Sequence, residues 1–240
     1  MHTSGDAALL AAWEAGRSQS PPARALSLLA STGVETATLA NWPLGRRDSA
    51  LLDLRAARFG PRITGLTHCP ACGDRLELDF AVDDVRTACA GDGEEECIVE
   101  TDEGCFRLAL RPLRTADLLA VAAQPQEAAL LARAVVRVDS DGEPHALATL
   151  PPAVVAAAAS RLAALDPQAD VRLALHCAAC AHEWTAPFDV GAFLWEEVDA
   201  WARRLLVEVH LLASAYGWRE PDILALSAAR RRAYLELVMA

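Results

Sequence analysis

The chain has 240 residues, of which 53% are hydrophobic, so it can bury a sizeable core as one large domain or two small ones. Its formal net charge is −11 and all 22 basic residues are arginines, which disfavours nucleic acid as the main ligand because a phosphate-binding surface needs a basic excess. No apolar run approaches the roughly 20 residues that span a bilayer, and no basic segment leads into an apolar one at residues 1–6, so we expect a cytoplasmic protein without membrane insertion.

The N-terminal part, residues 1–61, is predicted to be a helical head. Apolar residues at helical spacing predict helices at residues 6–15 and 23–30. A third helix is expected to be capped by Asp48 and to stop at Gly60.

The apolar period changes from helical to alternating at Arg62, where a predicted β domain, residues 62–192, begins. Alternation over residues 76–82 predicts a half-buried strand directly after one Cys-x-x-Cys pair. The same alternation over residues 171–175 and 184–190 predicts strands on both sides of a second pair.

A helical insertion, at about residues 111–166, is predicted within this β domain. A hairpin with an acidic turn precedes it at residues 97–110. Helices are expected at residues 116–123, 127–137 and 152–165.

The C-terminal segment, residues 193–240, is predicted to be helical. A continuous apolar stripe indicates a long helix that ends at Gly217, a residue suited to the left-handed conformation after a helix. Two shorter helices are expected at residues 220–226 and 228–239, the second capped by Ser227.

The two Cys-x-x-Cys pairs are Cys69 with Cys72 and Cys177 with Cys180, each at a predicted turn beside strands. Four thiolates from two such turns complete the tetrahedral shell of a structural zinc ion. The pairs lie 108 residues apart, and closing that loop costs on the order of 4 kcal/mol of chain entropy. Structural zinc supplies about 10–16 kcal/mol, which outweighs the cost. We therefore predict one Zn²⁺ ion as cofactor, in an α+β fold with helical termini around a small zinc-ribbon-like β unit.

Other interpretations of the cysteines are weaker. Seven cysteines in a chain with no export signal argue against a disulfide framework. A thiol-redox motif needs a Cys-x-x-Cys pair at a helix N-terminus, and both pairs here lead into strands. The rival ligands His68, His176 and His182 would be needed only if the four-sulfur shell were open. Cys89, Cys97 and Cys105 lack ligand spacing and are expected to be buried apolar thiols.

Sequence signatures of catalysis are absent: the chain has no Gly-x-Ser-x-Gly, no phosphate-binding Gly-rich loop, no His-Glu-x-x-His and no dinucleotide-binding glycine motif. No catalytic residue is assigned. The residues therefore indicate a zinc-stapled, non-enzymatic scaffold.

Three stretches resemble a known family. They are Pro43-Leu-Gly-Arg-Arg-Asp48 with Leu51-Leu-Asp-Leu-Arg55 and Phe59-Gly60; the two cysteine pairs; and Phe193-Leu-Trp-Glu-Glu197 continuing through Val209-His210, Tyr216-Gly-Trp218, Asp222-Ile-Leu224, Leu226-Ser227, Arg230-Arg-Arg232 and Tyr234-Leu235. Together they resemble baseplate-associated proteins of bacterial extracellular contractile injection systems, which are similar to baseplate proteins of contractile-tailed phages. The second cysteine pair departs from a Cys-Pro-x-Cys-Gly pattern, with Ala178, Ala179 and Ala181.

The resemblance implies a structural or assembly role in the baseplate or hub of a phage-tail-like particle. The implied partners are other baseplate or tail proteins, and the implied location is the cytoplasm during assembly or the particle itself. A zinc-ribbon nucleic-acid-binding or regulatory protein is the alternative, but acidic residues crowd the cysteine pairs.

The C-terminal segment is the candidate partner-binding surface. It combines aromatic anchors with arginines, a mixture that interfaces favour, and the candidate residues are Trp218, Arg230, Arg231, Arg232 and Tyr234. The other interpretation is that the apolar residues here pack on the protein's own helices while the arginines face solvent.

Overall fold

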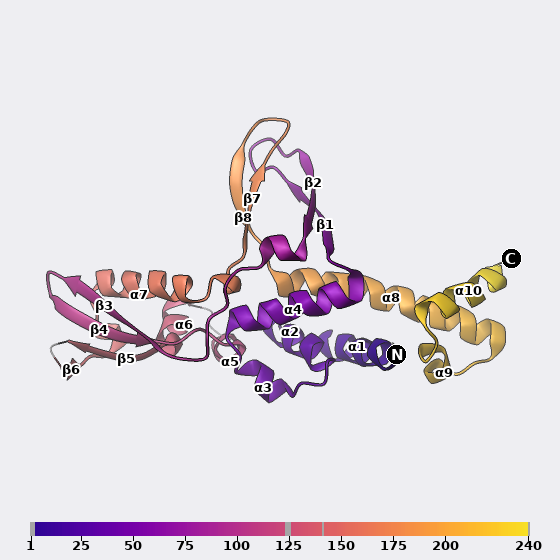
Figure 1. The fold of residues 1–240 in the computed structure, drawn as a ribbon, viewed down its shortest axis with the longest axis horizontal. Helices are drawn as coiled ribbons and strands as arrows, with labels where there is room; N and C mark the ends of the chain where they lie inside the picture. The colour runs from indigo at the N-terminus through magenta and orange to yellow at the C-terminus, as the bar shows by residue number, and fades with distance from the viewer. Residues whose placement is uncertain (1–2, 123–125, 141, 240) are drawn as a thin grey trace. The chain divides into compact units, whose positions relative to one another are not determined.

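The computed structural model describes residues 3–122, 126–140 and 142–239 (Figure 1). The chain divides into two compact units. We call Met1–Thr36 with Gly191–Ala240 the terminal unit and Ala37–Val190 the central unit. Helices and small sheets occur together, which confirms the predicted α+β class.

This division differs from the boundaries predicted at residues 61 and 192. Helices α1 (Thr3–Gly16) and α2 (Pro21–Ala30) group with the C-terminal helices, and residues 37–61 group with the β domain. Trp13 shows the physical reason, because its buried indole donates a hydrogen bond from Nε1 to Asp199 at 2.8 Å. Apolar periodicity in the sequence identifies a helix, but it does not show which helix, distant in sequence, that helix packs against.

The terminal unit contains α1, α2, α8 (Val190–Tyr216), α9 (Glu220–Leu224) and α10 (Ala228–Met239). Gly217 has φ +66° and follows α8 directly, which confirms the predicted helix end. The Arg230 backbone N–H donates to Ser227 Oγ at 3.3 Å, which confirms the predicted cap of α10. The buried core includes Leu9, Leu10, Leu28, Leu194, Val198, Leu205 and Leu212.

The central unit begins with α3 (Thr36–Ala40) and α4 (Leu44–Phe59). The prediction that Asp48 caps α4 is wrong, because the helix begins four residues earlier and Asp48 is buried within it. Two distant groups accept the first backbone N–H groups instead. The Leu44 N–H donates to the Leu113 carbonyl at 2.9 Å, and the Gly45 N–H donates to Asp166 Oδ2 at 2.8 Å.

Two antiparallel hairpins follow the pattern expected around the cysteines. One pairs β1 (Arg62–His68) with β2 (Arg75–Ala81), and the other pairs β7 (Arg172–His176) with β8 (Glu183–Pro187). The observed strands β2 and β8 end before the predicted ones. Val82, predicted as the last strand residue, begins a short 3-10 helix, η1 (Val82–Val85), and Val190, predicted likewise, begins α8.

A four-stranded antiparallel sheet lies between the hairpins in sequence, in the order β3 (Glu95–Thr101), β4 (Gly104–Leu110), β5 (Val135–Ser140) and β6 (Glu143–Pro144). The predicted hairpin at residues 97–110 is confirmed. Helix α7 (Pro152–Leu165), confirmed at its predicted bounds, packs on β3 and β4. The core here contains Phe106, Leu108, Leu110, Leu131, Val138, Val154 and Ala158.

The predicted helix at residues 127–137 is wrong in its last turn. Helix α6 (Glu127–Ala134) ends where β5 begins, and Leu108 of β4 lies opposite Val138. The β-branched residues Val135, Val136 and Val138 favour a strand over a helix, and pairing with β4 satisfies their backbone.

Short elements complete the central unit: α5 (Thr115–Ala120), η2 (Leu147–Thr149) and η3 (Pro167–Ala169). The helix expected at residues 116–123 is present as α5, but it ends at Ala120 and residues 121–122 form a turn, so the predicted end is too late; Ala123 lies outside the described residues. Among the helices that the structure describes, none combines the length and apolar character needed to cross a membrane.

Candidate metal centre

The two Cys-x-x-Cys turns share one backbone pattern. In the first, the Gly73 N–H donates to the Cys69 carbonyl at 2.9 Å and the Cys69 N–H donates to the Asp74 carbonyl at 2.8 Å. In the second, the Ala181 N–H donates to the Cys177 carbonyl at 2.8 Å and the Cys177 N–H donates to the His182 carbonyl at 2.9 Å. Each turn closes one hairpin, so both cysteines of a pair are held at its tip.

The turns bring all four predicted sulfurs together, with every Sγ within 4.8 Å of the others. Cys69 Sγ lies 3.6 Å from Cys180 Sγ, and Cys72 Sγ lies 3.7 Å from Cys177 Sγ. Zn–S bonds of about 2.3 Å in a tetrahedron place sulfurs about 3.8 Å apart, so the cluster fits a metal of this size. These separations are far longer than the roughly 2.05 Å of a disulfide bond.

Burial is uneven across the cluster. Cys69 and Cys177, the first cysteine of each pair, are buried, whereas Cys72 and Cys180 are exposed. The exposed pair leaves its two sulfurs accessible to a metal or chelator in solution. Figure 1 shows the two hairpins rising together from the rest of the central unit.

The electrostatics of the cluster favour a cation. Burial acts to raise the pKa of Cys69, but the backbone N–H groups of Cys72 and Ala71 outweigh it and lower the pKa to about 7. The Asp74 N–H acts to lower the pKa of Cys72, but the adjacent thiols, Cys180 first, raise it to about 12. Crowded sulfurs thus resist ionising together, and a bound cation removes that repulsion.

The three histidines near the turns lie outside this group of ligand atoms. His68 and His176 are exposed, and His182 stacks on Trp184 with ring centroids 5.8 Å apart. Over residues 3–122, 126–140 and 142–239, the group of four cysteines is the one cluster with metal-ligand geometry.

The remaining cysteines correct one expectation. Cys89 and Cys105 are exposed and Cys97 is half-buried, so these thiols are not the buried apolar residues predicted. Cys97 and Cys105 lie on strands β3 and β4, where successive side chains point to opposite faces of the sheet. Cys89 Sγ donates to the Gly45 carbonyl at 3.5 Å, and desolvation of the thiol by the neighbouring atoms raises its pKa although the residue as a whole is exposed.

The candidate partner-binding residues divide into two kinds. Arg231 is buried and donates to Asp6 at 3.1 Å, to Glu208 at 3.0 Å and to the Leu226 carbonyl at 2.7 Å. It therefore belongs to the interior of the terminal unit, and its prediction as an interface residue is wrong. Arg230 and Arg232 are exposed.

The two candidate aromatics are half-buried and pack with Tyr216. Trp218 stacks on Tyr216 at 4.7 Å between centroids and meets Tyr234 edge-on at 4.9 Å. This aromatic trio joins the end of α8 to α10, so these rings already pack within the protein's own fold.

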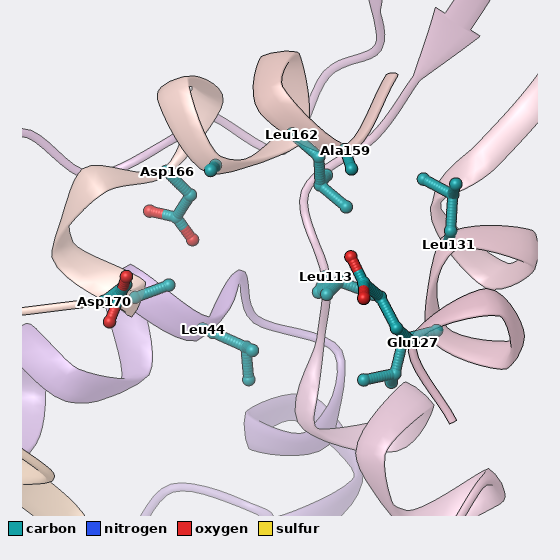
Figure 2. Close-up of a pocket in the computed structure, with 11 residues that line it drawn as sticks. Leu44, Leu113, Glu127, Leu131, Ala159, Leu162, Asp166 and Asp170 are labelled. Carbon is teal, nitrogen blue, oxygen red and sulfur yellow. The ribbon is translucent and has the colours of Figure 1, made fainter. Parts of the chain in front are cut away.

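An apolar pocket of about 250 Å³ also lies in the central unit (Figure 2). Leu44, Leu113, Leu131 and Leu162 form its walls, with Glu127, Asp166 and Asp170 among them. Asp166 Oδ2 and Oδ1 accept the N–H groups of Gly45 and Ala90, at 2.8 and 3.0 Å. Sequence analysis missed Asp166, because its partners are 121 and 76 residues away and no local motif marks it.

Comparison of the chain with protein-family models, with curated proteins and with solved structures gave no match. The geometry of the site and the sequence resemblance are therefore the basis for a functional proposal.

Proposed function

We propose that Cys69, Cys72, Cys177 and Cys180 bind one structural zinc ion, and that the chain is a non-enzymatic structural or assembly component of the baseplate or hub of a contractile injection particle. The observation that carries the metal assignment is the sulfur cluster, with all four Sγ atoms within 4.8 Å. Four thiolates fill a tetrahedral shell and leave no position for a reacting water. The ion's role is to hold the two hairpins together.

The assembly role rests on the resemblance of the three stretches to baseplate-associated proteins. Two of those stretches also contain residues that make specific tertiary contacts. Gly45 lies against Asp166, and Arg231 joins α10 to Asp6 and Glu208. Such fixed contacts within each unit suit a scaffold, which supports the proposal. The exposed acidic residues Glu77, Asp79 and Glu183, on the two hairpins that carry the cluster, disfavour the nucleic-acid-binding alternative.

Metal analysis of freshly purified protein tests the zinc site. We expect about one zinc per chain and four additional reactive thiols after chelation, together with loss of structure. Cys72→Ser and Cys180→Ser should each lose the metal. Cys105→Ser is the matched control, because Cys105 is an exposed cysteine outside the cluster, and it should retain the zinc. A folded protein without metal, or one that carries iron, would contradict the zinc assignment.

Affinity purification of the tagged full chain from its native host tests the assembly role. Baseplate proteins should co-purify, and removal of the chain should leave tails without complete baseplates in electron micrographs. The paired change Arg230→Ser with Arg232→Ser should reduce co-purification while Arg231 keeps the fold intact. Normal particles in the absence of the chain would overturn the assembly role and leave the zinc result standing.

A further inference from the structure

A groove of about 540 Å³ runs along β2 and β7, one strand from each of the two hairpins that carry the cysteine turns. It is lined by consecutive residues of the two hairpins, 77–80 and 171–175. Successive side chains of a strand point to opposite faces, so a groove lined by consecutive residues follows strand edges rather than one sheet face. In the described parts of the chain, β2 pairs only with β1 and β7 only with β8.

The hydrogen bonds that flank the first hairpin fix which backbone groups face this groove. The Cys69 N–H donates to the Asp74 carbonyl and the Val82 N–H donates to the Pro61 carbonyl, both at 2.8 Å. Bonded pairs alternate with non-bonded pairs in an antiparallel ladder, so Leu76, Leu78 and Phe80 bond to β1. Glu77 and Asp79 therefore direct their backbone N–H and C=O groups to the outer edge.

Ala81 supports this alternation of inward and outward backbone groups. Its N–H points away from β1 and donates to Asp84 Oδ2 at 2.7 Å. The second hairpin shows the same alternation of bonded and non-bonded pairs. The Cys177 N–H donates to the His182 carbonyl and the Phe188 N–H donates to the Val171 carbonyl, which places the backbone groups of Arg172 and Ala174 on the outer edge of β7.

The side chains along the groove define what it can accept. Leu78, Phe80, Leu173 and Leu175 are half-buried and form an apolar layer. The charged residues of the lining are four carboxylates, Glu77, Asp79, Asp84 and Asp170, and one guanidinium, Arg172. Three of these carboxylates hold ion pairs with the protein's own arginines: Asp170 with Arg172 at 2.9 Å, Glu77 with Arg75 at 3.6 Å, and Asp79 with Arg62. The pairs are exposed to solvent and contribute little, so basic side chains of an occupant can share the carboxylates. An occupant that complements both features has apolar residues alternating with basic ones.

We propose that this groove docks an extended basic segment of a partner protein, which adds as a third strand to the outer edge of β2. Its backbone pairs with Glu77 and Asp79, its apolar side chains cover Leu78 and Phe80, and its basic side chains lie beside the two carboxylates. The inference is independent of the baseplate role. It requires only that the cysteine cluster hold the two hairpins in place.

Fluorescence anisotropy with the metal-loaded full chain tests the proposal. The probe is a labelled nine-residue peptide of alternating lysine and valine, and two backbone-methylated versions carry N-methyl groups on one alternate set of residues or on the other. Strand addition uses only one set of N–H groups, so one version should bind at least tenfold more weakly and the other nearly normally. Equal affinities of the two versions, or no binding of the parent peptide at millimolar concentration, would overturn the proposal.

Charge variants and hydrogen exchange locate the docked strand. Glu77→Lys with Asp79→Lys should weaken binding at least tenfold, and added salt should weaken it as well. Glu183→Lys on β8 is the matched control and should bind like the unaltered chain, because Glu183 does not line the groove. In the unaltered chain, the backbone amides of Glu77 and Asp79 should exchange more slowly with peptide bound.

Equal binding of a glutamate–valine peptide, or self-association of the chain that excludes the peptide, would contradict the assignment. Peptide binding without baseplate co-purification would overturn the proposed function alone.

Discussion

Gly73 and Ala181 occupy equivalent positions in the two cysteine turns, and both adopt a left-handed backbone, with φ +77° and +57°. Glycine accepts this conformation without steric cost, whereas a Cβ atom makes it less favourable by roughly 1–2 kcal/mol. Ala181 is the one non-glycine residue with positive φ in the described part of the chain. The second turn therefore carries local strain that the first avoids.

Ala181→Gly should stabilise the metal-loaded protein, by about 0.5–1 kcal/mol once the greater flexibility of glycine in the unfolded chain is subtracted. Gly73→Ala should destabilise it by a similar amount. Urea unfolding measures both changes. Ala178→Gly lies in the same turn without positive φ and should be slightly destabilising, so a gain in stability from both glycine variants would contradict the strain argument.

Gly45→Ala should destabilise the central unit by at least about 2 kcal/mol. A Cβ at this position would lie 2.0 Å from Asp166 Oδ1, so the carboxylate that accepts the Gly45 and Ala90 N–H groups must move. Asp166→Ala should also be destabilising, and the double variant should lose less than the sum of the two. Gly91→Ala, where an added Cβ has no neighbour within 4 Å, should change stability by less than about 0.5 kcal/mol.

Local patterns explain what could be predicted from the sequence. The four cysteines were identified because each turn and its flanking strands are encoded within about a dozen residues. Gly217 was identified because a helix end is also a local feature. Asp166 and Arg231 act through partners far away in the sequence, Gly45 for one and Asp6 for the other. A buried arginine and an exposed one look alike in a basic run, so only packing distinguishes Arg231 from Arg232.

Arg231→Met should destabilise the terminal unit by about 1–3 kcal/mol, because Asp6 and Glu208 are partly exposed and water can hydrate them once the guanidinium is gone. The guanidinium is 2% exposed, and its loss leaves Asp6 and Glu208 without a shared cation. Methionine keeps much of the apolar volume, so the change reports charge rather than a cavity. Arg232→Met, on the same helix but exposed, should stay within about 0.5 kcal/mol of the unaltered chain in thermal or urea unfolding. Equal effects of the two variants would show that the ion pairs of Arg231 with Asp6 and Glu208 do not stabilise the fold more than an exposed arginine does.

Asp48 should make stability depend on pH in a direction opposite to that of most carboxyl groups. Burial, together with Asp189 and Asp166, outweighs the adjacent Arg47 and raises the pKa of Asp48 from 3.8 to about 6. The folded state then holds this proton more tightly than the unfolded state, so its stabilising contribution is complete below pH 4 and is lost as pH rises through 6.

The size of this effect is about 3 kcal/mol, because each pKa unit corresponds to 1.36 kcal/mol and Asp48 is largely buried. Asp48→Asn has no charge at any pH, so the unfolding free energy of the natural chain minus that of the variant should fall by up to this amount between pH 4 and 7. Taking the difference cancels protonation of the cysteine cluster, which is common to both proteins. A difference that stays constant across the series would show that Asp48 is ionised in the folded state throughout, with the Arg47 Nε hydrogen bond of 2.7 Å to Asp48 Oδ1 sufficient to offset its burial.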